Sequence, residues 1–182
     1  MAEPGPSRSN KEAQLDIEVI RHAEVWDGSS VTDAMLSGAA NAAFSAASPT
    51  GGGSYEITIL LTDDREMREL NRLWRGKDSS TNVLSFPAGE PFDTVNCEAA
   101  PLGDVVLAAE TVLAEASQQG ISIADHVSHL VVHGVLHLLG HDHERDEDAE
   151  AMETLETEIL ASLGVADPYA EAGDAPLAEL AR

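Results

Sequence analysis

The chain has 182 residues, long enough for one domain with a full hydrophobic core and short for two domains that fold independently. Hydrophobic residues make up 43% of it and charged residues 24%, and no apolar run approaches the ~20 residues of a membrane helix, so we expect neither wholesale disorder nor membrane insertion. The formal net charge of −23 argues against a nonspecific nucleic-acid binder, because attraction to polyanions normally comes from a basic surface.

Hydrophobic periodicity and capping residues predict four strands and five helices. Alternating apolar and polar residues and short apolar runs predict strands at residues 15–20, 55–62, 82–86 and 103–108. Helical periodicity predicts helices at about 33–47, 64–74, 109–119, 123–139 and 146–163. Strands and helices alternate early and helices gather late, which is typical of an α/β or α+β domain with one central mixed β-sheet of about four strands.

The two ends of the chain differ in composition from the middle. Residues 1–14 are rich in Pro, Ser and charge and lack the apolar core of a secretory signal, so we expect a disordered leader and a cytoplasmic protein. Residues 15–165 form the predicted domain, and residues 166–182 form a predicted flexible, acidic tail. Cys97 is the only cysteine, which excludes an internal disulfide and any zinc cluster built on cysteines.

The predicted helix at 123–139 carries four histidines on one face. They are separated by three, four and four residues, which places them within an arc of roughly 80°: His126, His129, His133 and His137. His133 and His137 lie one turn apart, a separation at which two imidazoles can bind the same ion. A lone histidine is more often a core or surface group than a ligand, but this many on one face favour a metal site.

Gly140 permits a left-handed backbone at the helix end, so the chain can turn back and bring His143 to the same ion. His141 is an alternative third ligand. Three histidines with a water in the fourth position form a catalytic zinc site, whereas structural sites usually have four protein ligands. We therefore predict one Zn²⁺ ion per chain, bound by His133, His137 and His143, with one coordination position open.

Other positions of this helix indicate which roles its further histidines have and which substrate the site favours. We expect His126 and His129 to be buried hydrogen-bond partners or to orient the ligands. Metalloproteases with this ligand spacing place a glutamate directly after the first histidine as general base, and here that residue is Gly134. A peptide is therefore a less favoured substrate.

Four arginines share one side of the predicted helix at 64–74 and its end: Arg65, Arg68, Arg72 and Arg75. We expect the opposite side to face the core through Met67, Leu70 and Trp74. Guanidinium groups suit paired contacts to phosphate oxygens, so these arginines could position a polyanion on an otherwise acidic protein. The alternative is a solvated helix face balanced by neighbouring carboxylates.

Four segments together resemble one known family. They are SHLVVHGVLHLLGHDHERD at 128–146, NRLWRGKDSSTNVLSFP at 71–87, LGDVVL at 102–107 and METLETEILASLG at 152–164. In these segments the chain resembles the YbeY family of bacterial rRNA maturation factors and single-strand-specific endoribonucleases. The resemblance extends over roughly residues 15 to 165. Two positions depart from the family pattern, with His141 in place of a tyrosine and Asn82 in place of an acidic residue.

The resemblance implies a small α/β metalloprotein with one zinc ion on the same three histidines and a catalytic role for Arg75. It also implies cleavage of single-stranded RNA in 16S rRNA 3′-end maturation, and a part in ribosome quality control. The expected partners are the 16S rRNA precursor and 30S or 70S ribosomal particles, with no membrane and no DNA. The proton acceptor stays open among a metal-bound hydroxide, Asp142, Glu144 and the ribose 2′-OH.

Two other functions fit parts of the sequence. One is a ribosome assembly factor that zinc stabilises and that cuts nothing itself. The other is a metalloprotease, which shares the ligand spacing but would need a proton acceptor that Gly134 cannot supply. Metal-dependent cleavage of RNA, or of peptide, separates the three.

Overall fold

The computed structural model describes residues 13–47, 52–89, 99–142 and 145–170, so Cys97 and His143 lie outside the described residues. Its elements follow in chain order: β1 (Ala13–Arg21), η1 (Glu24–Trp26), α1 (Asp33–Ala47), β2 (Gly53–Thr62), α2 (Asp64–Arg75), β3 (Val83–Pro87), β4 (Ala100–Ala108), α3 (Ala109–Gln119), α4 (Ile123–Leu138) and α5 (Asp146–Ser162). Every predicted strand and helix is present. The short 3-10 helix η1 was not predicted.

The four strands form one mixed sheet in the order β1-β2-β4-β3. β1 pairs with β2, and β2 with β4, in parallel, whereas β3 pairs with β4 in the antiparallel direction. The predicted single α/β domain with a mixed sheet is therefore confirmed. β3 lies at one edge of the sheet. A side chain near this edge therefore has to pass around a single strand to reach from one face of the sheet to the other.

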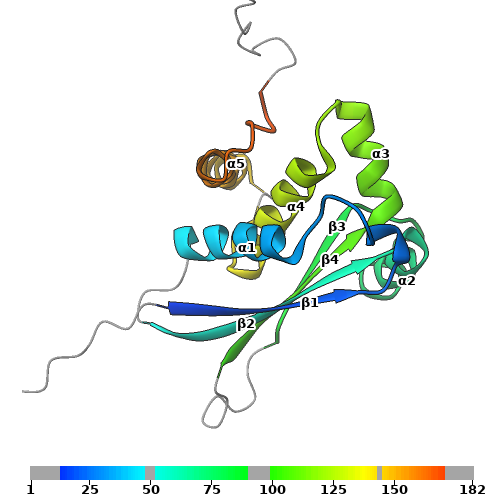
Figure 1. Cartoon of the computed structure of the whole chain (residues 1–182). Helices are drawn as coiled ribbons and strands as arrows, with labels where there is room; N and C mark the ends of the chain where they lie inside the picture. The colour runs from blue at the N-terminus through cyan, green and yellow to red at the C-terminus, as the bar shows by residue number, and fades with distance from the viewer. Residues whose placement is uncertain (1–12, 48–51, 90–98, 143–144, 171–182) are drawn as a thin grey trace, which may run out of the picture.

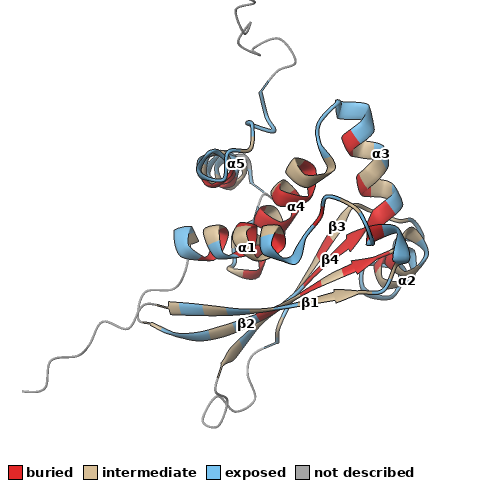
Figure 2. Ribbon diagram, in the orientation of Figure 1, coloured by how far each residue is buried: buried red, intermediate tan, exposed pale blue. Residues whose placement is uncertain are grey.

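Helices cover the two faces of the sheet unequally (Figure 1). α1 and α4 lie over one face, with α5 packed outside them, and α2 lies on the other side (Figure 1). Successive residues of β4 serve both layers, because side chains alternate along a strand. Val105 and Leu107 join the main core, and Val106 and Ala108 join a smaller cluster with Met67. Buried residues accordingly concentrate on β4 and on α4 (Figure 2).

Within the described residues, no helix combines the length and the apolar character that crossing a membrane requires.

Helix α2 confirms one part of its predicted core face and contradicts another. The Asp63 side chain accepts a hydrogen bond from the Glu66 backbone N–H at 2.8 Å and so caps the helix. Met67 is fully buried, as predicted. The prediction for Trp74 was wrong, because its side chain is 71% exposed and only leans on Phe86, with ring centroids 5.8 Å apart. The helix ends above the edge strand, where the sheet no longer covers its last turn.

Helix α4 lies very close to the sheet at Gly134. A Cβ placed on this residue would stand 2.7 Å from Cγ1 of Val105 and 3.1 Å from Oγ of Ser85. The Ser85 hydroxyl also donates a hydrogen bond to the Gly134 carbonyl oxygen at 3.1 Å. The close approach therefore requires glycine at this position, whatever its low helix propensity costs.

Replacement of Gly134 by Ala should destabilise the protein. A methyl group adds about 1 kcal/mol of helix propensity, but forcing the stiff Val105 side chain aside costs about 1–3 kcal/mol. Gly38→Ala in α1 is the matched control, because its Cβ would meet nothing within 4 Å. Urea unfolding should give a lower free energy of unfolding for Gly134→Ala and an equal or higher one for Gly38→Ala. Equal stability of the two variants would contradict the close packing.

Candidate metal centre

Helix α4 directs its histidines to different partners. The Ser122 side chain caps the helix by accepting from the Asp125 N–H at 3.0 Å. Near this end, His126 is buried and its Nε2 lies 2.8 Å from Oε2 of Glu115 on α3. The Asn82 side-chain amide donates to the same Glu115 oxygen at 2.9 Å. His126 therefore joins α4 to α3 and to the start of β3, which is the role expected of a buried hydrogen-bond partner.

His133 and His137 form the candidate centre, with their Nε2 atoms 3.0 Å apart. The Nδ1 of His133 lies 2.7 Å from Oε1 of Glu156, and the Nδ1 of His137 lies 2.9 Å from the carbonyl oxygen of His141. A carbonyl oxygen can only accept a hydrogen bond, and so can an ionised carboxylate. Each Nδ1 therefore donates, and the two Nε2 atoms, which face each other, are the positions at which the rings could bind a metal.

This arrangement fits a divalent metal ion. With both rings neutral, the two Nε2 lone pairs would face each other and repel, and a cation between them would remove that repulsion. Two histidine nitrogens on one tetrahedral zinc ion, each at ~2.0–2.1 Å, lie about 3.3 Å apart, close to the distance between these two Nε2 atoms. Metal-binding histidines also usually donate their other N–H to a carboxylate or a backbone carbonyl. His133 donates to the Glu156 carboxylate, and His137 donates to the backbone carbonyl of His141.

The turn after α4 follows the predicted conformation. Gly140 has φ of 91°, and the His141 N–H donates to the Leu136 carbonyl oxygen at 3.0 Å. The backbone that leaves α4 thus bends back toward His137. Among the described residues no three potential ligands gather around one point, and His143 lies outside them. The third ligand therefore stays a prediction.

A buried carboxylate on α5 completes the surroundings of His133. Glu156 is 1% exposed and accepts hydrogen bonds from His133, from the Nε2 of His129 at 3.2 Å, and from the hydroxyl of Tyr169. Burial alone would raise the pKa of Glu156, but these three donors outweigh it and hold the pKa at about 2. Burial and the contact with Glu156 raise the pKa of Tyr169, so its phenol stays protonated and donates.

Neither Glu156 nor Tyr169 was predicted from the sequence to belong to the site. Glu156 carried a detectable signal, because it occupies the apolar side of α5 among Met152, Ile159 and Leu160, all buried. A carboxylate at such a position needs buried donors. Tyr169 carried no such signal, since it lies in the segment 166–182 that was predicted to be a tail. Residues 166–170 of that segment are described, and Tyr169 contacts the candidate site.

The arginine side of α2 divides into two groups. Arg68 forms a two-point ion pair with Asp78, with nitrogen–oxygen distances of 2.7 and 2.9 Å, and Arg65 lies 3.9 Å from Asp63. Arg65 and Arg68 therefore agree with the alternative of a solvated helix face balanced by neighbouring carboxylates. Arg72 and Arg75 are exposed and form no ion pair with the described residues. The hydrogen bond from Arg68, and also the charge of the nearby Arg72, lower the pKa of the Asp78 carboxylate. A phosphate could therefore reach Arg75, but not Arg72, without competing with a described carboxylate.

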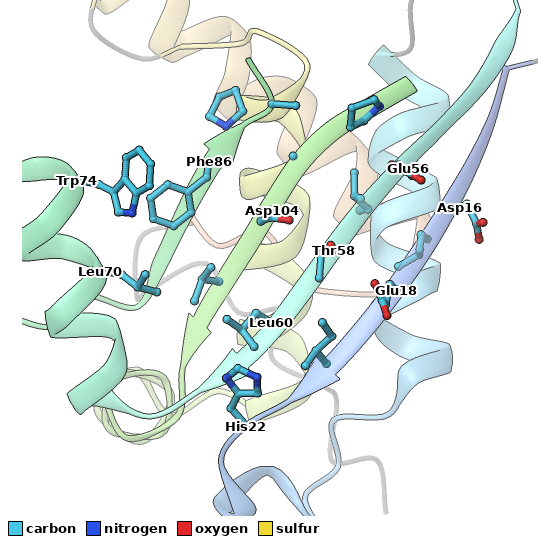
Figure 3. A pocket seen from close by; sticks show the side chains of 18 residues that line it. Asp16, Glu18, His22, Glu56, Thr58, Leu60, Leu70, Trp74, Phe86 and Asp104 are labelled. Atoms are coloured by element: carbon cyan, nitrogen blue, oxygen red, sulfur yellow. The ribbon is translucent and has the colours of Figure 1, made fainter. Parts of the chain in front are cut away.

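A hollow of about 1180 Å³ lies on the face of the sheet opposite α4 (Figure 3). Leu70, Trp74 and Phe86 form its apolar side. Carboxylates of three strands also line it: Asp16, Glu18, Glu56 and Asp104. No histidine of α4 lines this hollow. Its negative charge repels phosphate, so we do not regard it as the site of RNA cleavage.

Comparison with known proteins identifies the family. The family model described as Endoribonuclease YbeY matches residues 27–164. The Endoribonuclease YbeY of Parvibaculum lavamentivorans is 51% identical over 176 residues, which cover 91% of this chain and 93% of that protein. The one from Agrobacterium fabrum is 45% identical over 170 residues, covering 91% and 99%. The chain therefore belongs to the YbeY endoribonuclease family, as its resemblance in four segments predicted.

The fold is shared with a solved structure. The solution structure of TM1509 from Thermotoga maritima superposes with a TM-score of 0.51 and covers 86% of this chain and 100% of that chain. Their sequences are 21% identical, so this comparison supports the α/β fold alone.

Replacement of His141 by Tyr should leave metal binding intact, because His137 uses the backbone carbonyl of residue 141 and not its side chain. Metal analysis should find a zinc-to-protein ratio near one in the wild type and in His141→Tyr. The same measurement on His133→Ala and His137→Ala should find little zinc. Loss of zinc from His141→Tyr would identify His141, instead of His143, as the third ligand.

Proposed function

We propose that this protein is a zinc-dependent, single-strand-specific endoribonuclease of the cytoplasm that acts in 16S rRNA 3′-end maturation and ribosome quality control. Membership of the YbeY family supports RNA hydrolysis. The observation that supports a metal ion at this site is the pair of Nε2 atoms on His133 and His137, which lie 3.0 Å apart. The Nδ1 atoms of both rings are hydrogen-bonded to other groups. In this proposal His143 is the third ligand, and the substrate is precursor 16S rRNA within 30S or 70S particles.

The chain's own residues supply geometry and charge to this reaction. When bound, zinc supplies a Lewis acid for the phosphate and a water that is activated at neutral pH. His133 and His137 would hold the ion through their Nε2 atoms, with the orientation of each ring set by the partner of its Nδ1. The Glu156 carboxylate stays ionised beside them because its pKa is about 2.

Strand β3 supports a role for Arg75 at the same site. Phe86 contacts Trp74 on the α2 face of this strand, and its neighbour Ser85 bonds to Gly134 on the α4 face. Arg75 directly follows Trp74, and His133 directly precedes Gly134. Because β3 is the edge strand, an arginine side chain from the end of α2 has only one strand to pass to meet a phosphate near the histidines. There it would stabilise charge on the phosphoryl oxygens.

The position that a metalloprotease uses for its general base cannot hold one here. A Cβ on Gly134 would already meet Val105 and Ser85, so a glutamate side chain has no space. This close packing favours a phosphodiester over a peptide as substrate.

Metal-dependent cleavage of RNA is the test of the proposed function. The full-length protein, with zinc and after treatment with a chelator, is incubated with a single-stranded RNA, its matching duplex and an unstructured peptide. We expect products from the single strand alone, loss of activity with the chelator, and recovery when zinc is restored. Binding of RNA without metal-dependent cleavage would favour the assembly factor, and cleavage of the peptide would favour the protease.

Replacement of Arg75 by Ala should slow cleavage about 100-fold or more, because one donor to the transition-state charge is lost. Zinc content and melting temperature should stay near wild type, since Arg75 is exposed and forms no ion pair with the described residues. Arg75→Lys keeps the charge but loses the planar fork, so it should recover only part of the rate.

Arg65→Ala is the matched control for Arg75→Ala. It removes the same charge from the same helix at a point ~15 Å away along the axis. Because Arg65 lies beside Asp63 on the solvated part of this helix, we expect RNA binding and the rate at saturating RNA to stay near wild type. A wild-type rate for Arg75→Ala at saturating substrate would remove Arg75 from the catalytic step.

A further inference from the structure

The carboxylate of Glu156 is the most deeply buried charged group among the described residues. It lies on the side of α5 that carries the buried residues Met152, Ile159 and Leu160, and it faces His129 and His133 of α4. Burying an ionised carboxylate among apolar side chains is strongly unfavourable unless its oxygens accept hydrogen bonds. Packing alone would favour an apolar residue such as leucine at this position. We therefore expect the glutamate to be there for the hydrogen bonds that it accepts.

Both carboxylate oxygens of Glu156 accept hydrogen bonds, and each oxygen has different donors. Oε1 accepts from the Nδ1 of His133 at 2.7 Å. Oε2 accepts from the Nε2 of His129 at 3.2 Å and from the Tyr169 hydroxyl. One oxygen thus contacts the candidate ligand, and the other is held in place from two directions, by α4 and by the segment after α5.

The two histidines of the candidate centre depend on different kinds of group. The His137 ring is oriented by the backbone carbonyl of residue 141, which no side-chain replacement removes. The His133 ring is oriented by the side chain of Glu156, which itself depends on His129 and Tyr169. The orientation of His133 is therefore the part of the site that side chains outside the histidine motif control.

We infer that Glu156 is a positioning residue for His133, and that Tyr169 and His129 hold its carboxylate in place. The carboxylate keeps the proton on Nδ1 and aims the unprotonated Nε2 at the metal position, 3.0 Å from its counterpart on His137. The segment after α5 then contributes to the metal centre, because its Tyr169 holds the carboxylate that orients His133. This inference rests on the proposed function, because it assumes that His133 binds the metal.

The zinc affinity of full-length variants tests the inference, measured by competition with a chromogenic chelator. Glu156→Gln keeps the shape but loses the charge, and we expect zinc affinity to fall 10- to 100-fold. Tyr169→Phe removes one hydroxyl, and we expect a loss of about threefold to tenfold, because the carboxylate keeps its other two donors. Glu158→Gln is the control, since it makes the same charge change at an exposed position of the same helix and should bind zinc like the wild type.

A second measurement separates positioning from general stability. Long-range proton–nitrogen NMR of the imidazole rings reports which His133 nitrogen carries the proton. In metal-free wild type and Glu158→Gln we expect the proton on Nδ1, and in Glu156→Gln a mixture of both tautomers, while His137 keeps its proton on Nδ1 throughout. A purely structural role for Glu156 would lower the melting temperature without changing the His133 tautomer.

Equal zinc affinity of Glu156→Gln and Glu158→Gln would overturn the inference. If Glu156→Gln does not fold, Tyr169→Phe decides, and wild-type affinity with an unchanged His133 tautomer in that variant would overturn it. A wild-type protein that binds no zinc would instead contradict the proposed function, so the two failures are distinguishable.

Discussion

The close contact between α4 and the strands β3 and β4 is the constraint on which the site depends. At Gly134 only a hydrogen atom fits between the helix and Val105, and the Ser85 hydroxyl reaches the helix backbone. The helix is therefore fixed in rotation and in height above the sheet. His133 and His137, one residue before and three residues after Gly134 on the same helix, inherit that fixed orientation. A looser helix would carry the same histidines without holding their nitrogens at one point.

The opposite side of α4 meets α5 through a polar contact inside an otherwise apolar interface. Apolar packing between two helices tolerates small rotations, because it has little directional preference. Hydrogen bonds from His129 and His133 to Glu156 are directional, so they select one arrangement of the two helices. The unfavourable burial of the Glu156 charge is offset only in that arrangement. The same contact therefore specifies how α5 packs and which way His133 faces.

The sequence predicted the fold well because most of its signals are local. Alternation and capping located all four strands and all five helices, and Gly140 has the left-handed backbone expected of it. The prediction failed for Trp74, because periodicity shows which side of a helix is apolar but not where the sheet beneath it ends. It also missed Tyr169, whose partner Glu156 lies on a different element. Spacing along one helix indicated His133 and His137, whereas contacts between elements required the structure.

The contact between Tyr169 and Glu156 also concerns the order in which the protein is made. Synthesis proceeds from the N-terminus, and elements form as the chain emerges. Helix α4 and its histidines are therefore available before α5, and α5 before Tyr169. Until residue 169 has emerged, the Glu156 carboxylate lacks its hydroxyl donor, and the ring of His133 is less firmly held. The geometry proposed to hold the metal is consequently completed only after the segment that follows α5 has emerged.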